Sequence, residues 1–143
     1  MKAKKIVVDS SIIADHLTTA NGESLLRKLS KEYFCYTTVF NAIELFVVSN
    51  SLKETQAIED AMSAMKVLGV NPKSAKNMAS TISSSKNHFS ALIAGVCIES
   101  KLPIITLNPK RFSGIKKLKV RSIKHSMVRT SFAHNRAMPL FSY

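Results

Sequence analysis

Short apolar segments alternate with longer segments of helical periodicity along this chain, and this alternation constrains its fold most. Residues 5–8 form the first apolar segment, and Asp9, Ser10 and Ser11 lead from it into apolar residues at helical spacing over 12–17. A strand that continues through a polar turn into a helix is a βα unit, and a continuously apolar strand is typical of a parallel sheet. We therefore predict an α/β fold, a three-layer α/β/α sandwich around a short, mainly parallel central sheet.

The same periodicities predict the remaining elements. Further strands are expected at 33–37, 102–106 and 118–120, with a minimal strand at Val70. Helices are expected around 25–29, over 39–48 with Thr38 as its cap, from Ser51 to Leu68, over 72–82 and over 90–100. The order of strands and helices indicates one domain over 1–121, followed by a basic and weakly patterned tail over 122–143.

Composition excludes several classes of protein. No apolar run approaches the roughly 20 residues that cross a bilayer, and the short run after the basic N-terminus is not a signal peptide. Cys35 and Cys97 each stand in apolar surroundings. We expect buried free thiols and a cytoplasmic protein that is not associated with a membrane.

The charge is large and unevenly distributed. The chain has 21 Lys and Arg against 9 Asp and Glu, a net charge of +12. Residues 1–60 hold 7 basic and 8 acidic residues, whereas residues 61–143 hold 14 basic residues and only Glu99 as an acid. The excess indicates a polyanionic partner such as nucleic acid. The distribution excludes a site that draws several carboxylates from the second half.

Candidate site residues follow the predicted strands, because the carboxyl ends of parallel strands meet at one edge of a sheet. Asp9 follows the first strand and could cap a helix or hold a divalent cation. Glu44 and Asn41 are the polar residues of the otherwise apolar 39–48 segment. A buried carboxylate needs a partner, so Glu44 should contact either a metal ion or a lysine or arginine.

Ser90, Thr106 and Asn108 have ordinary structural roles open to them as well. Ser90 begins an apolar helical run and could be its N-cap. Thr106 and Asn108 follow a buried strand, where turns between strand and helix often contain asparagine.

Taken in order, these segments resemble the PIN domain family. The segment 7–13 resembles the opening motif, 38–45 the second motif, 90–95 the third, 102–112 the fourth and 114–120 the closing strand. The resemblance runs in order over about residues 5–121. It implies a metal-dependent ribonuclease, often a toxin of the VapC type, that gathers three or four acidic residues around Mg²⁺ or Mn²⁺.

Matched by motif position, the residues keep part of that acidic set. Asp9 and Glu44 match the first two acids, and Asn108 stands where the family has Asp or Asn. Ser90 stands where the family has its third Asp, and Arg111 where it has an Asp before Phe. Ser10, Thr38, Ser90 and Thr106 would be supporting hydroxyls.

The departure at Ser90 changes the charge available to a metal. Asp9 and Glu44 would be its only anionic ligands, because Ser90 and Asn108 add neutral oxygens. Mg²⁺ accepts one or two carboxylates with water, so one ion could bind weakly, whereas a two-metal site would lack charge compensation. Glu99 is nine residues beyond Ser90 and cannot replace the missing acid.

A basic run begins at Lys110, at the end of the fourth motif, and continues to Lys124. It could be a solvated face or a surface that tracks phosphates. We expect two of its residues, Lys110 and Arg111, at the rim of the site. The predicted nucleic-acid-binding residues are Lys110, Arg111, Lys116 and Lys117.

Two functional hypotheses follow from these features. The first is a PIN-like, Mg²⁺- or Mn²⁺-dependent endoribonuclease with catalytic residues Asp9, Glu44 and Asn108, acting as the toxin of a type II toxin–antitoxin pair. The resemblance implies RNA as substrate, a small antitoxin protein as partner and a homodimer. The alternative is a degenerate PIN domain that binds RNA or a protein partner without cleavage, which the serine at position 90 favours.

Overall fold

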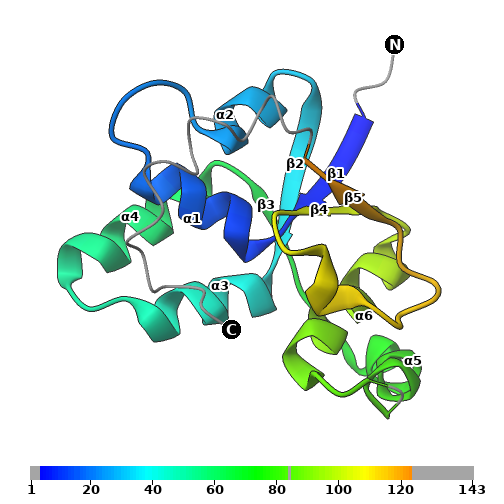
Figure 1. Ribbon diagram of the computed structural model, residues 1–143. Coiled ribbons are helices and arrows are strands. Elements are labelled where there is room, and N and C mark those ends of the chain that lie inside the picture. The colour runs from blue at the N-terminus through cyan, green and yellow to red at the C-terminus, as the bar shows by residue number, and fades with distance from the viewer. Residues whose placement is uncertain (1–3, 84, 124–143) are drawn as a thin grey trace.

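The protein folds around a five-stranded parallel sheet with the strand order β3-β2-β1-β4-β5 (Figure 1). The computed structural model describes residues 4–83 and 85–123. The central strand β1 pairs with β2 on one side and with β4 on the other. The strands are β1 (Lys4–Val8), β2 (Tyr33–Thr38), β3 (Lys66–Leu68), β4 (Ile104–Thr106) and β5 (Val120–Ser122).

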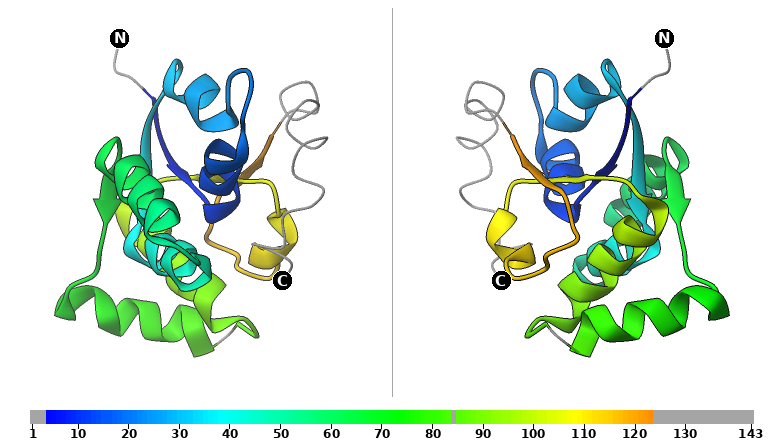
Figure 2. Two further views of the ribbon diagram at one scale, coloured as in Figure 1. Left: turned by 90° about the vertical axis from the view of Figure 1, so that its left-hand side faces the viewer. Right: turned by 90° about the vertical axis from the view of Figure 1, so that its right-hand side faces the viewer.

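Helices connect the strands and cover both faces of the sheet. Figure 2 shows α5 and α6 at one side of the molecule and α1 and α2 at the other. The helices are α1 (Ser10–Thr18), α2 (Leu25–Ser30), α3 (Val39–Val48), α4 (Leu52–Ser63), α5 (Pro72–Ser83) and α6 (His88–Ser100), with a short 3-10 helix, η1 (Pro109–Phe112), after β4.

Two apolar cores lie on opposite faces of the sheet, because successive strand residues point to opposite faces. Ile6 and Val8 of β1 pack into a core with residues of α1, α2 and α4. Val7 packs on the other face with Ile93 and Cys97 of α6. This arrangement confirms the predicted three-layer sandwich around a parallel sheet.

Capping side chains fix where the helices begin. Thr38 and Asn41 form a reciprocal capping box at the start of α3, and the Ser51 hydroxyl accepts the Glu54 amide at the start of α4. Asn87 caps α6, since its side chain accepts the Ser90 amide. Ser90 therefore lies in the first turn of α6, and its prediction as the N-cap is wrong.

Two edge strands differ from the prediction. The helix expected to extend to Leu68 ends at Ser63, and residues 66–68 form β3, so the minimal strand expected at Val70 lies earlier. The strand expected at 118–120 is β5, displaced to Val120–Ser122. The sheet thus continues one residue past the predicted boundary at 121, and the tail beyond residue 123 lies outside the described residues.

Both cysteines are buried free thiols, as predicted. Burial raises the pKa of Cys35 and of Cys97. Within the described part of the chain, no helix has the length and apolar character to cross a membrane.

Candidate functional site

Asp9 lies at the carboxyl end of the central strand and is completely buried. It occupies the N-cap position of α1, but its side chain makes no capping hydrogen bond. The carboxylate instead accepts hydrogen bonds from Asn41 Nδ2 (2.9 Å, to Oδ1) and from Thr106 Oγ1 (2.7 Å, to Oδ2). The Asp9 side chain therefore does not act as a helix cap, which was one of the two roles predicted for it.

Glu44 reaches the same point from α3, where it is 7% exposed. The β2–α3 connection begins at the edge of the sheet where β1 ends, so the first turns of α3 face the end of β1. The Ser10 hydroxyl donates to Glu44 Oε1 at 2.6 Å. The supporting role predicted for Ser10 stays a prediction, and its hydroxyl lies beside Glu44.

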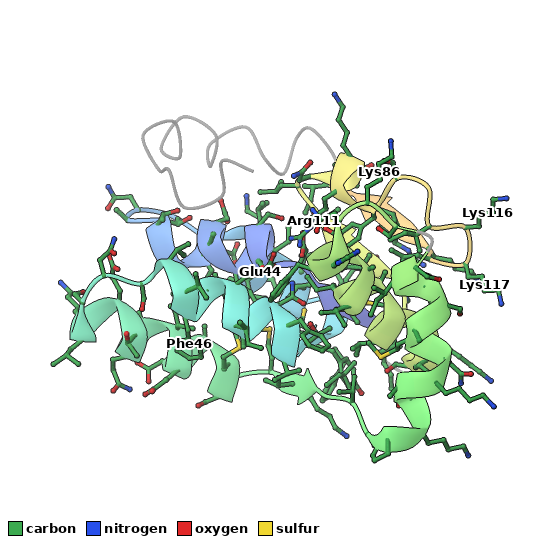
Figure 3. The ribbon with its side chains drawn as sticks, turned by 90° about the horizontal axis from the view of Figure 1, so that it is seen from below. Glu44, Phe46, Lys86, Arg111, Lys116 and Lys117 are labelled. Atoms are coloured by element: carbon green, nitrogen blue, oxygen red, sulfur yellow. The ribbon has the colours of Figure 1, made fainter. Side chains whose placement is uncertain are left out.

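Arg111 places its guanidinium between the two carboxylates. Its Nη1 lies 3.2 Å from Asp9 Oδ1 and 3.2 Å from Glu44 Oε1, and its Nη2 lies 2.7 Å from Glu44 Oε2. Figure 3 shows the labelled Arg111 beside Glu44, on the inner side of the lysines. Its side chain is 7% exposed. The prediction of Arg111 as a rim residue that binds nucleic acid is thus wrong about its position.

Ser90 binds the Nε–H group of the Arg111 guanidinium. Its Oγ accepts a hydrogen bond from Arg111 Nε at 2.9 Å, and the serine is completely buried. Ser90, at the position where an aspartate was expected, therefore contacts Arg111, which was expected at the rim of the site. Phe112 adds a further contact, since its ring centroid lies 5.1 Å from Arg111 Cζ.

Asn41 links the carboxylates to the start of α3 and was not predicted as a site residue. Its Nδ2 donates to Asp9 Oδ1 and, at 2.8 Å, to Ser10 Oγ. Its Oδ1 accepts a hydrogen bond from Thr38 Oγ1 at 2.7 Å. The supporting role predicted for Thr38 stays a prediction. The signal in the sequence is its spacing, because Asn41 and Glu44 share one face of an otherwise apolar helix.

Thr106 and Asn108 complete the strand end in different ways. Thr106 Oγ1 donates to Asp9 and accepts the backbone N–H of Asn108 at 2.9 Å. Asn108 thus meets the site through its main chain, and it precedes η1, the helix that carries Arg111. The predicted catalytic role of the Asn108 side chain stays a prediction.

Burial opposes charge on Asp9. Desolvation raises the pKa of Asp9, while the neighbouring Arg111 and the hydrogen bond from Thr106 act to lower it and the nearby Glu44 adds to the rise. One guanidinium faces two carboxylates, so the donors from Asn41, Ser10 and Thr106 supply part of the stabilisation that the cation alone does not. No buried side-chain nitrogen or oxygen among the described residues lacks a partner.

These residues do not fit Mg²⁺ or Mn²⁺ in this arrangement. Hard cations need converging oxygen ligands, but here the space between Asp9 and Glu44 is lined by the N–H groups of Arg111. The Ser90 oxygen also accepts from Arg111. Within residues 4–83 and 85–123 no three His, Cys, Asp or Glu side chains are grouped so that they could hold a metal ion.

The lysines predicted to bind nucleic acid do not join this cluster. Lys110, Lys116 and Lys117 are exposed. Figure 3 shows Lys116 and Lys117 at the outer edge of the molecule, with Lys86 nearer the site.

No family model matches this sequence, and no curated protein matches it. The fold, in contrast, matches solved structures. A toxin–antitoxin complex from Klebsiella pneumoniae has 17% identity and a TM-score of 0.63 over 83% of this chain and 96% of that one. VapBC2 from Rickettsia felis, bound to a promoter DNA fragment, has 16% identity and a TM-score of 0.68 over 82% and 98%. DNA-bound VapBC from Salmonella typhimurium has 17% identity and a TM-score of 0.66 over 83% and 98%.

The chain has a PIN-like fold. At these identities the likeness concerns the fold. The residues at the strand ends of this PIN-like chain are therefore interpreted from their own contacts.

Proposed function

We propose that this PIN-like chain binds RNA through one basic face and does not cleave it by a metal-dependent route. Binding is favoured over cleavage because the guanidinium of Arg111 lies between Asp9 and Glu44. Metal-dependent hydrolysis needs a cation that activates water or clamps the phosphate. A side-chain guanidinium provides neither an open coordination position nor a bound water.

The choice of a nucleic acid as partner rests on how charge is distributed over the surface, and RNA is the nucleic acid that the resemblance to PIN domains implies. Exposed lysines lie before α6, in η1 and in the segment after η1, namely Lys86, Lys110, Lys116 and Lys117. Exposed acids lie on α4, namely Glu54, Glu59 and Asp60. Figure 1 shows α4 at the opposite side of the molecule from η1, and Figure 3 shows Lys86, Lys116 and Lys117 on the side away from α4. A surface with cations on one side attracts a polyanion in one orientation.

The test is the salt dependence of RNA binding. Fluorescence anisotropy with a labelled single-stranded RNA should give a steep fall in affinity with NaCl concentration. Replacing Lys110, Lys116 and Lys117 by alanine should reduce the magnitude of the log–log slope by about 2, because each phosphate contact on a single strand contributes about 0.7.

A matched control removes three lysines elsewhere. Lys5, Lys53 and Lys66 are also exposed, and their replacement by alanine changes the net charge by the same amount. We expect a much smaller change in slope from this variant. Equal losses from both variants would show binding by net charge alone and would contradict the proposed face.

A second candidate is the binding of a small protein of the antitoxin kind. It is favoured by the likeness to toxin–antitoxin complexes, two of which are bound to DNA. Co-expression with small proteins encoded beside this chain, followed by measurement of the stoichiometry of any complex, tests it. Growth arrest on expression that Asp9→Asn abolishes would instead support the toxin ribonuclease of the first hypothesis.

A further inference from the structure

The pair of residues at positions 90 and 111 has a consequence for what the site can bind. We propose that Arg111 is the permanent cation of this site: its guanidinium, anchored by Ser90, takes the position of a divalent metal ion and holds the end of β1 to α3 without one. The proposal deepens the non-cleaving part of the proposed function and is independent of where RNA binds.

The contacts of the guanidinium are those of a bridging cation. Nη1 lies 3.2 Å from an oxygen of each carboxylate, and Nη2 adds a 2.7 Å contact to Glu44. Arginine stays charged in proteins, and its planar fork suits carboxylates. One side chain from η1 therefore joins the end of β1, through Asp9, to α3, through Glu44.

Ser90 is the partner that such a bridge requires. Its hydroxyl accepts the Nε–H of Arg111 at 2.9 Å and adds no negative charge. An aspartate at this buried position would bring a third carboxylate to a single guanidinium, which burial would penalise strongly. The neutral residue at 90 and the cation at 111 thus fit each other.

Neutral donors bind the same carboxylate oxygens that Arg111 contacts. Asp9 accepts from Asn41 and Thr106, and Glu44 accepts from Ser10. A divalent ion would have to displace Arg111 and leave its guanidinium without these acceptors, in a position where its side chain is 7% exposed. The arrangement therefore disfavours metal binding by the native chain.

The experiment is a titration with Mn²⁺ alone, followed by isothermal calorimetry and by the thermal midpoint Tm. The native chain should show no stoichiometric binding at submillimolar Mn²⁺ and no rise in Tm. The double variant Ser90→Asp/Arg111→Ala should bind Mn²⁺ and gain Tm with increasing concentration, because a ligand that binds only the folded state stabilises it.

A control double variant, Ser113→Asp/Arg121→Ala, makes the same exchange of residue types at exposed positions. It should respond to Mn²⁺ as the native chain does. Circular dichroism shows whether Ser90→Asp/Arg111→Ala is folded. If it is folded and fails to bind Mn²⁺, the proposal that Arg111 takes the position of a metal ion is overturned. If the double variant does not fold, the Mn²⁺ titration of the native chain tests the proposal by itself.

Two results on the native chain would overturn the proposal. One is stoichiometric Mn²⁺ binding that Asp9→Asn abolishes. The other is Mn²⁺-dependent cleavage of mixed RNA that is lost in Asp9→Asn. Neither result would affect the lysine variants, so failure of this inference and failure of the RNA-binding face are distinguishable.

Discussion

The amide nitrogen and the amide oxygen of the Asn41 side chain bind different parts of the molecule. Its amide nitrogen donates to Asp9 and Ser10, while its amide oxygen accepts from Thr38 at the start of α3. It is completely buried. Its side chain thus couples the capping of a helix to the position of a buried carboxylate.

Replacement of Asn41 should therefore be costly. We expect Asn41→Ala to lower the free energy of unfolding by about 2 kcal/mol or more, because buried donors and acceptors lose their partners. Asn41→Asp should cost more, since it brings a third carboxylate beside Asp9. Urea unfolding measures both. Asn77→Ala, at an exposed position of α5, should change stability by less than about 0.5 kcal/mol, and a similar cost at both positions would contradict the coupling.

Sequence reasoning identified the carboxylates of this cluster but not its cation. Asp9 and Glu44 could be predicted because one follows a strand and the other is a lone acid on an apolar helix. A lysine or arginine partner for Glu44 was an open alternative, and the structure supplies Arg111. Nothing in a basic run tells which side chain turns inward, because that depends on the path of η1 after β4.

At the scale of elements, hydrogen bonds between α1 and α2 fix the connection that joins them. Asp15 accepts the backbone N–H of Leu25 at 2.8 Å. His16 Nδ1 lies 2.8 Å from Ser24 Oγ, which also accepts the amide of Arg27. A neutral imidazole can accept the Ser24 hydroxyl through Nδ1, whereas a protonated ring cannot.

This contact predicts a dependence of stability on pH. Burial, assisted by the charge of Arg27 and opposed by that of Asp15, lowers the pKa of His16 from its ordinary value of 6.5. The unfolded chain therefore binds a proton that the folded chain resists, and stability is lost as pH falls below 6.5 toward the lower folded pKa.

Comparison with His16→Gln isolates this contribution. The difference in unfolding free energy between the native chain and the variant should be constant above pH 7 and should shrink as the pH falls to 5. Chemical unfolding at several pH values measures it. A difference that stays constant with pH, or one that grows on acidification, would contradict the assignment.

Strands were predictable where burial is two-sided and less so at the edges of the sheet. The apolar run of β1 is buried on both faces, so its sequence identifies it. Residues 66–68 continue a helical pattern and become a strand because they pair with Tyr36, Thr37 and Thr38 of β2. Such three-residue strands depend on a neighbour far along the chain, which local periodicity does not report.

At the scale of the whole molecule, α3 presents apolar side chains to the surface. Ile43 is 42% exposed, Phe46 37% and Val47 76%. Figure 3 shows Phe46 on the side of the molecule away from Lys116 and Lys117. The homodimer predicted from the family resemblance stays a prediction, and we expect any such contact to involve these exposed apolar side chains.

Substitution on α3 tests self-association. If the chain forms a dimer through α3, Val47→Glu should shift it toward monomer, because the dimer would bury the new charge. Sedimentation velocity over a range of protein concentrations measures the equilibrium. Val70→Glu introduces the same charge at another exposed valine and should leave association unchanged. A dimer that both variants preserve would contradict a contact through α3.

The bridge made by Arg111 also joins residues that lie far apart along the chain. Asp9 and Arg111 are 102 residues apart, and Glu44 and Arg111 are 67 apart. Contacts across such long loops carry a high closure entropy and form after the local helices. Until η1 docks, the two carboxylates face each other without their cation. Docking of η1 thus relieves the repulsion between Asp9 and Glu44, and we expect Arg111 to govern the rate at which the folded chain opens more than the rate at which it forms.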